Sequence, residues 1–161
     1  MSVLASHRKE SRVEAILFSV ELHERLTELI QKDFGVKDLD QLVRIRYAYG
    51  IDKTENFSRY RELMRSEKKK IDQLAYLLTN NLRGANSIYP TSMREYEQRR
   101  DYQNFAIVNC EQLIKELQRV VEIFDVDINV YERSVKAINR EIDLIKKWRQ
   151  RDNKLKSSLQ G

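Results

Sequence analysis

Apolar residues recur along most of the chain at spacings of three, four and seven, which is the period of amphipathic helices. Four long segments carry this pattern. We predict helices from about residue 3 or 8 to residue 32, from 54 to just before Pro90, from 92 to 124, and from 128 to about 156. The apolar positions that define the first helix are Val13, Ile16, Leu17, Val20, Leu26, Leu29 and Ile30. Those of the second are Tyr60, Met64, Ile71, Leu74, Leu78, Leu82 and Ala85, and those of the third are Ala106, Cys110, Leu113, Leu117, Val120 and Phe124. Those of the fourth are Tyr131, Val135, Ile138, Ile142 and Ile145.

Residues typical of helix ends separate these segments. Gly35 follows the first helix as a C-terminal cap. Pro90 ends the second helix, because the residue before a proline disfavours helical geometry. Ser92 and Glu95 form a capping-box pattern at the start of the third helix. The segment 38–50 is predicted to be a short extra helix within the first connection.

The scarcity of turn-forming residues favours long elements. The chain has only 4 glycines and 1 proline in 161 residues, which disfavours a sheet with many hairpins. We therefore predict an all-α fold, a four-helix bundle with a short extra helix in its first connection. A single domain spans 1–161, and its tail is frayed over 157–161.

Composition places this bundle in a reducing, aqueous compartment. Cys110 is the only cysteine, so no internal disulfide can form. No apolar run reaches the ~20 residues that a membrane span requires. The first residues lack the pattern of a signal peptide, so we expect a cytoplasmic protein without a membrane partner.

The sequence contains no recognisable catalytic or cofactor motif. Its two histidines, His7 and His23, lie outside any zinc motif, and no phosphate-binding glycine loop occurs. Cys110 lies on the apolar stripe of its helix, where a buried thiol is inert. We therefore expect no enzyme activity, no catalytic residue, no metal and no cofactor.

Charge offers a stronger signal. The formal net charge is +5, and the fourth helix collects cations on one face with Glu141 and Asp143 outside that sector. The stripe consists of Arg133, Lys136, Arg140, Lys147, Arg151 and Lys154. A second cluster in the second helix includes Arg61, Arg65 and Lys68. Both clusters suit non-specific contact with phosphates, and a solvated face is the alternative.

Aromatic residues near these cations form a second candidate surface. Trp148, beside Leu144, lies between the apolar and basic sectors of the fourth helix, as either a core-edge residue or an interface anchor. The third helix opens with tyrosines and arginines that suit a contact surface, although Tyr96 and Tyr102 could instead pack over the bundle end. These tyrosines and arginines are Tyr96, Arg99, Arg100 and Tyr102.

Three segments together carry a family likeness over roughly 54–156. They are NNLRGANSIYP, EYEQRRDYQNFAIVNCEQLIKELQ and REIDLIKKWRQRDNK. The most telling piece is Glu141, Ile142, Ile145, Trp148 and Arg149, an acidic-apolar turn that runs into a lone tryptophan among cations. This resembles the four-helix-bundle accessory variability proteins of diversity-generating retroelements. It also resembles the wider set of small bundle proteins that include inserts in ribosomal RNA genes.

The resemblance implies a non-enzymatic partner of a retroelement reverse transcriptase. Similar proteins form a homo-oligomeric ring of five subunits with a basic surface. They bind the reverse transcriptase with RNA of the template-repeat and spacer type, and DNA, in mutagenic cDNA synthesis. The alternative is a structural or protein-interaction bundle without nucleic-acid binding.

Overall fold

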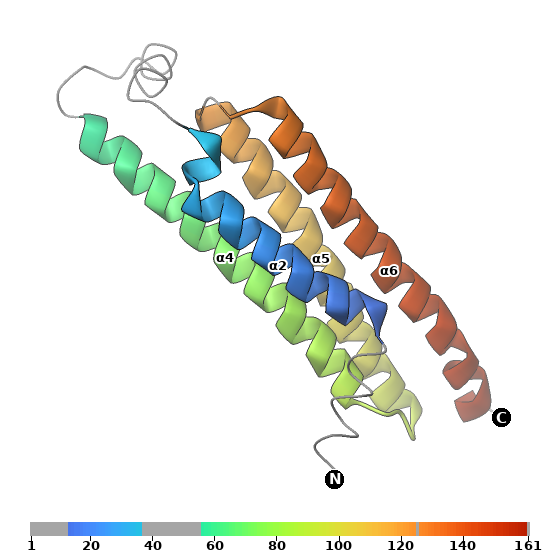
Figure 1. Ribbon diagram of the computed structural model, residues 1–161. Helices are drawn as coiled ribbons and strands as arrows, with labels where there is room; N and C mark the ends of the chain where they lie inside the picture. The colour runs from blue at the N-terminus through green and yellow to red at the C-terminus, as the bar shows by residue number, and fades with distance from the viewer. Residues whose placement is uncertain (1–12, 37–55, 125, 161) are drawn as a thin grey trace, which may run out of the picture.

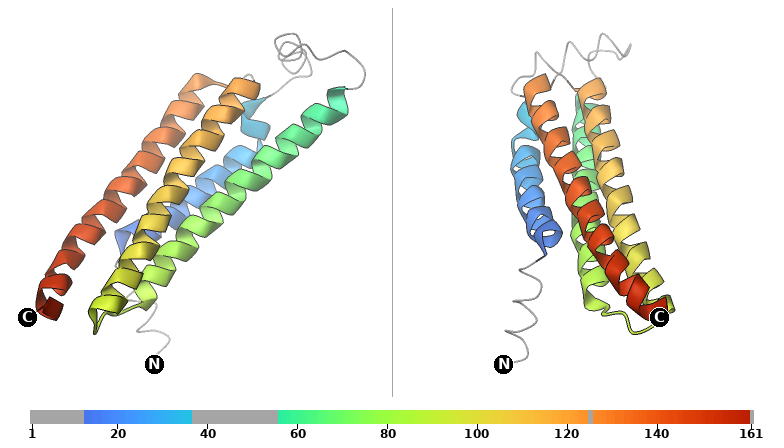
Figure 2. Two further views of the ribbon diagram at one scale, coloured as in Figure 1. Left: turned by 180° about the vertical axis from the view of Figure 1, so that it is seen from behind. Right: turned by 90° about the vertical axis from the view of Figure 1, so that its right-hand side faces the viewer.

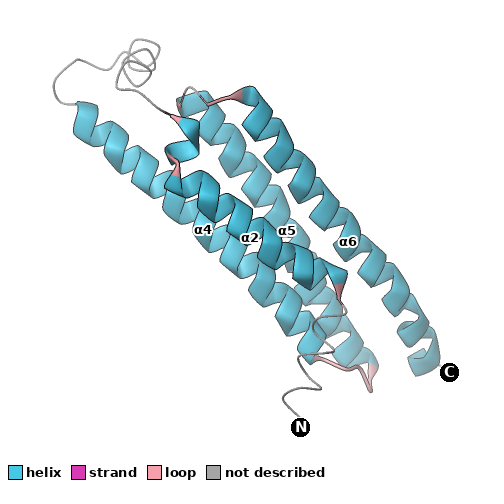
Figure 3. Ribbon diagram, viewed as in Figure 1, coloured by secondary structure: helices cyan, strands magenta, loops and turns pink. Residues whose placement is uncertain are grey.

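All elements in the described part of the chain are helical. The computed structural model describes residues 13–36, 56–124 and 126–160. The helices are α2 (Glu14–Gln31), η1 (Asp33–Gly35), α4 (Asn56–Ser87), α5 (Met93–Ile123) and α6 (Ile128–Gln160). No strand occurs among these residues (Figure 3). The predicted all-α class is confirmed.

The four long helices run alternately up and down as an antiparallel bundle (Figures 1 and 2). α2 packs against α4 and α6, and α5 packs against the same two helices from the other side. α4, α5 and α6 are long, whereas α2 is shorter, so among the described helices part of α6 has no neighbour on that side (Figure 1). This mismatch in length creates one of the surfaces considered below.

The ends of the helices follow from local chemistry. The Ser92 hydroxyl accepts a hydrogen bond from the Glu95 backbone N–H at 3.2 Å, which caps α5 as predicted. The Asp127 carboxylate likewise accepts from the Asn129 N–H at 2.9 Å, before α6. Gly35 ends η1 with a φ of 80°, the left-handed conformation that glycine adopts without steric cost.

The core lies along the bundle axis, and α4 and α5 contribute the faces that the sequence predicted. In α4, Ile71, Leu78 and Leu82 are fully buried. The whole predicted α5 stripe is buried as well, namely Ala106, Cys110, Leu113, Leu117, Val120 and Phe124.

The predicted face of α2 is partly wrong. Leu17 is 50% exposed and Val20 is 38% exposed, whereas Phe18 and Leu22 are buried in their place. α4 and α6 both pack against α2. The buried face of α2 is therefore the one that contacts both helices, and it does not coincide with the densest run of apolar residues.

Other predicted boundaries differ at the ends. α6 extends to Gln160, so the tail predicted to be frayed is helical up to that residue. The first helix begins at Glu14 within the described residues. Its predicted start before residue 13, the predicted short helix at 38–50 and Thr54 lie outside them.

Candidate nucleic-acid interface

The polar first turns of α5 pair with the end of α6 inside the chain itself. The Arg99 guanidinium donates to both carboxylate oxygens of Asp152, with distances of 2.7 and 3.0 Å. It also donates to the Ile88 carbonyl at 3.0 Å, beyond the end of α4. Gln103 donates to Asp152 at 2.9 Å. Two oxygens therefore receive three hydrogen bonds in a mostly buried place, which satisfies that carboxylate.

Arg100 extends the same network toward solvent. Its guanidinium donates to the Tyr96 hydroxyl at 2.6 Å, to the Asn153 side chain at 2.8 Å and to the Arg149 carbonyl at 3.2 Å. Tyr96 is buried. These contacts join α5 to α6, so Tyr96 packs within the bundle, the alternative that the sequence left open for it. Arg99 and Arg100, which were predicted to belong to a contact surface, pack there as well.

Trp148 is also a core residue. Only 3% of it is exposed, and the Arg99 guanidinium lies 5.1 Å from its ring centroid in a cation–π contact. Tyr102 is different, because it is partly exposed and lies over α4 at Gly84. A Cβ on Gly84 would come within 2.9 Å of the tyrosine ring, so the glycine permits this close approach.

The basic stripe of α6 has the exposure that the sequence predicted. All six of its residues are exposed, from Arg133 to Lys154. Arg140 lies over the Phe18 ring at 4.6 Å, and Arg133 donates to the Asn129 carbonyl at 3.3 Å. The other four make no ion pair with any described residue; they are Lys136, Lys147, Arg151 and Lys154.

Three of these free cations line a shallow hollow of about 540 Å³ beside the N-terminal end of α2. Lys147, Arg151 and Lys154 surround it, with Leu144 at its edge. Among the described residues of the lining, Glu14 is the only carboxylate. Three cations in one concave site, against one anion, attract a group of high negative charge such as a phosphate.

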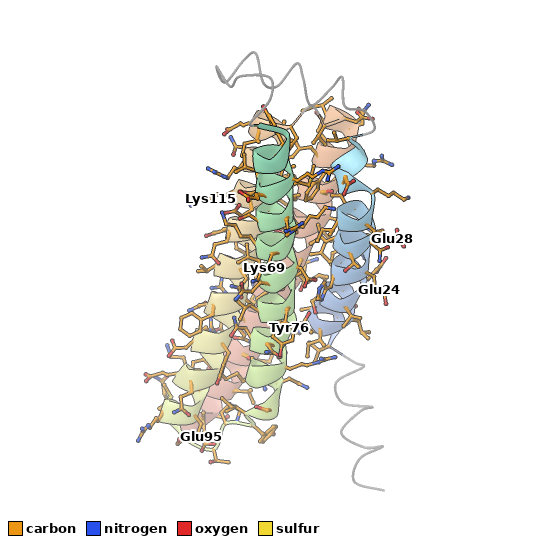
Figure 4. The ribbon with its side chains drawn as sticks, turned by 90° about the vertical axis from the view of Figure 1, so that its left-hand side faces the viewer. Glu24, Glu28, Lys69, Tyr76, Glu95 and Lys115 are labelled. Atoms are coloured by element: carbon orange, nitrogen blue, oxygen red, sulfur yellow. The ribbon has the colours of Figure 1, made fainter. Side chains whose placement is uncertain are left out.

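The second basic cluster does not join this surface. Arg61 and Arg65 are exposed on α4, and Lys68 forms an ion pair with Asp33. α2 lies between α4 and α6, and it presents the exposed carboxylates Glu21, Glu24 and Glu28. Figure 4 shows Glu24 and Glu28 on α2 beside Lys69 on α4. The acidic residues of α2 therefore separate the two basic regions.

Buried Glu141 is the least expected residue of α6. Its side chain is fully buried, and neither carboxylate oxygen has a hydrogen-bond partner among the described residues. Burial raises the pKa of this carboxyl to about 9, although Arg140 acts in the opposite direction. Burial also raises the pKa of the nearby Cys110 thiol, and Glu141 adds to that shift. Both groups are therefore neutral at pH 7.

The sequence held a signal for two residues that its interpretation missed. Asp152 follows Trp148 by four residues, and Glu141 precedes Ile145 by four, so both share the helix face of buried Ile145. A carboxylate on an apolar face indicates a buried polar contact. For Asp152 that contact is Arg99. For Glu141 the described residues provide none.

Comparisons of the chain with protein-family models, with curated proteins and with solved structures found no match. No described helix is both long and apolar enough to cross a bilayer. Within the same residues, no group of three or more His, Cys, Asp or Glu side chains is placed to hold a metal ion. The site is therefore interpreted from its own geometry.

Proposed function

We propose that the chain is a non-enzymatic accessory protein that binds RNA, and the corresponding cDNA, through the basic face of α6. In this proposal it assembles into a homo-oligomer and supports a reverse transcriptase in mutagenic cDNA synthesis. The observation that carries the proposal is the hollow lined by Lys147, Arg151 and Lys154, whose cations have no ion-pair partner in the described residues. The retroelement role rests on the sequence resemblance.

The shape of this surface favours contact with a nucleic-acid backbone over base recognition. The exposed side chains of the stripe are long and flexible cations, and none is held in a bidentate geometry that could select a base. Such contacts release counterions from the phosphates, so affinity falls linearly with the logarithm of the salt concentration. We therefore expect RNA binding with little sequence preference.

Lys147→Glu combined with Arg151→Glu is the decisive variant. Both residues are exposed, line the hollow and lack an ion pair, so their replacement removes phosphate contacts while leaving the core intact. We expect RNA affinity to fall by more than about tenfold, and the salt slope to flatten by about 0.7 for each lost contact. Arg140 is less suitable, because its contact with the Phe18 ring also contributes to packing.

A matched control uses Arg94→Glu with Lys115→Glu, which changes the net charge equally at exposed positions of α5. Filter binding of single-stranded RNA at several salt concentrations would compare the three proteins, and thermal melts would verify their folding. Equal loss of RNA affinity in both double variants would mean that the loss is caused by the change in net charge and not by these two positions. Unchanged affinity in the Lys147/Arg151 variant would leave the bundle without a nucleic-acid role on this face.

A structural or protein-interaction bundle is the second candidate. The exposed carboxylates of α2 favour this candidate, because they repel a nucleic-acid backbone. They would restrict RNA to one side of the molecule. The two candidates are separated by the RNA titration described above.

A further inference from the structure

A groove of about 490 Å³ runs between α2 and α4, on the side of α2 away from α6. Val20 and Tyr76 contribute apolar surface to it, and Tyr76 is 57% exposed. Leu17, which is half exposed, lies one turn before Val20 on the same helix. Figure 4 shows Tyr76 on α4, facing outward between the two helices. Val20 and Tyr76 thus present apolar surface within the groove, and Leu17 adds exposed apolar surface to the same helix outside the lining.

The walls of this groove are fixed by two polar contacts between the helices. The Thr79 hydroxyl donates to the buried Ser19 hydroxyl at 3.0 Å, and Ser19 donates to the Ile16 carbonyl at 2.7 Å. Nearer the surface, the His23 imidazole contacts the Asp72 carboxylate at 2.8 Å. Because both contacts hold α2 against α4, the groove exists before any partner arrives and needs little reorganisation on binding.

The α2 wall carries negative charge, and Arg83 of α4 is the one Lys or Arg among the described lining residues. Glu24 and Glu28 line the groove, and neither forms an ion pair with a described residue. They lie four residues apart on the helix, a spacing at which like charges face one another and repel. Glu21, on the same side of α2, is paired with Arg25 at 2.7 Å. A cation from another molecule would relieve the repulsion between Glu24 and Glu28.

We propose that this groove docks an amphipathic helix of a partner protein, with an apolar stripe flanked by lysine or arginine. The apolar stripe covers Val20 and Tyr76, and the flanking cations meet Glu24 and Glu28. Nucleic acid and anionic lipid are disfavoured here, because their phosphates would face these carboxylates. The inference is independent of RNA binding, which uses the opposite flank of α2.

The probe for this proposal is a fluorescein-labelled model helix about 18 residues long, with leucines at helical spacing and lysines on both flanks. A matched peptide replaces every lysine with glutamate. Fluorescence anisotropy with the full-length chain should show binding of the lysine peptide and at least about tenfold weaker binding of the glutamate peptide. Equal binding of the two peptides would overturn the proposal.

Variants then locate the contact. Glu24→Lys with Glu28→Lys, and separately Tyr76→Ala, should each weaken binding of the lysine peptide by at least about tenfold. The control is Glu97→Lys with Glu111→Lys, the same charge change at exposed positions of α5, and it should retain most of the affinity. The Lys147/Arg151 variant should bind as the wild type does, even if it loses RNA.

Two results would exclude the groove. Equal loss in the Glu24/Glu28 variant and the Glu97/Glu111 control would indicate attraction to acidic residues in general. Full binding by the Tyr76→Ala variant, or by Val20→Asp, would show that the apolar stripe docks elsewhere. Circular dichroism melts of each variant would establish that the bundle is intact, which is expected because the changed side chains are at least partly exposed.

Discussion

Arg99 and Asp152 show how a bundle can bury opposite charges without leaving either one alone. The guanidinium fork fits the carboxylate, Gln103 supplies a further donor, and the Trp148 ring covers the guanidinium. A buried ion pair is only weakly stabilising compared with apolar packing, but removing one partner leaves an uncompensated charge. Such a pair therefore contributes more to fixing the alignment of α5 and α6 than to the total free energy of folding.

Glu141 is the opposite case, because its carboxyl is buried and the part of the chain that the structure describes offers it no hydrogen-bond partner. Its ordinary pKa is 4.5, and burial raises the pKa in the folded chain to about 9. The folded state thus retains a proton that the unfolded state loses between these two values. The stability that this group contributes is fully present below pH 4.5 and is lost as the pH rises through about 9.

Glu141→Gln should therefore stabilise the protein increasingly as the pH rises. The amide cannot ionise, so the variant avoids the loss of about 1.4 kcal/mol per pH unit that a shifted carboxyl produces. Urea unfolding at pH 5, 7 and 9 would measure the difference in the free energy of unfolding between variant and wild type. Glu97→Gln, at an exposed site, is the control. A difference independent of pH would contradict the shifted pKa of Glu141.

At the scale of elements, helix phase was predictable where each helix carries one clear apolar stripe. α4 and α5 do so, and their predicted core residues are buried except Met64 and Leu74 of α4, which are partly buried. α2 carries apolar residues almost all round, from Ala15 to Leu22, and periodicity alone could not choose between them. In α6 the buried face includes Trp148, Asp152 and Glu141. A prediction based only on aliphatic residues therefore places the centre of the buried face at the wrong position around the helix.

The phase of α2 can be tested by truncating two leucines. Leu22→Ala should destabilise the bundle by about 2–5 kcal/mol, because Leu22 is buried and its loss leaves a cavity. Leu17→Ala should change stability by no more than about 0.5 kcal/mol, because Leu17 is half exposed. Thermal or urea melts of the two variants would measure this. Comparable losses would mean that both leucines are covered, as the sequence pattern alone suggested.

On the scale of the whole molecule, the sequence predicted the architecture better than the surface. Scarce turn residues and four amphipathic segments determine a bundle almost by themselves. The basic stripe was also predictable, because it lies on one helix. The separation of the two basic clusters by α2 was not, since it depends on which helices are neighbours. For the same reason, the partners of Arg99 and Arg100, on α6, could not be identified from α5 alone.

Assembly is the property of the whole molecule on which the proposed function depends most. We expect the purified chain to be a homo-oligomer, most simply the pentamer that the sequence resemblance implies. The subunit mass is 19.3 kDa, so light scattering at micromolar concentration should give a multiple of this value. A mass near 19.3 kDa would contradict the expectation. Trp148 cannot serve as the anchor between subunits, because it is buried within its own chain.

The contacts of Arg99 also have a consequence for the order in which the chain acquires its structure during synthesis. Its bond to the Ile88 carbonyl spans 11 residues, whereas its bonds to Asp152 span 53. A ribosome releases α4 and α5 before α6. The hairpin that α4 and α5 form therefore exists at first without Asp152, the α6 residue whose carboxylate pairs with Arg99. Water must then solvate the guanidinium, and the adjoining end of the hairpin stays open. Arrival of α6 displaces that water, because Asp152 then pairs with Arg99, and α6 so completes this end of the hairpin.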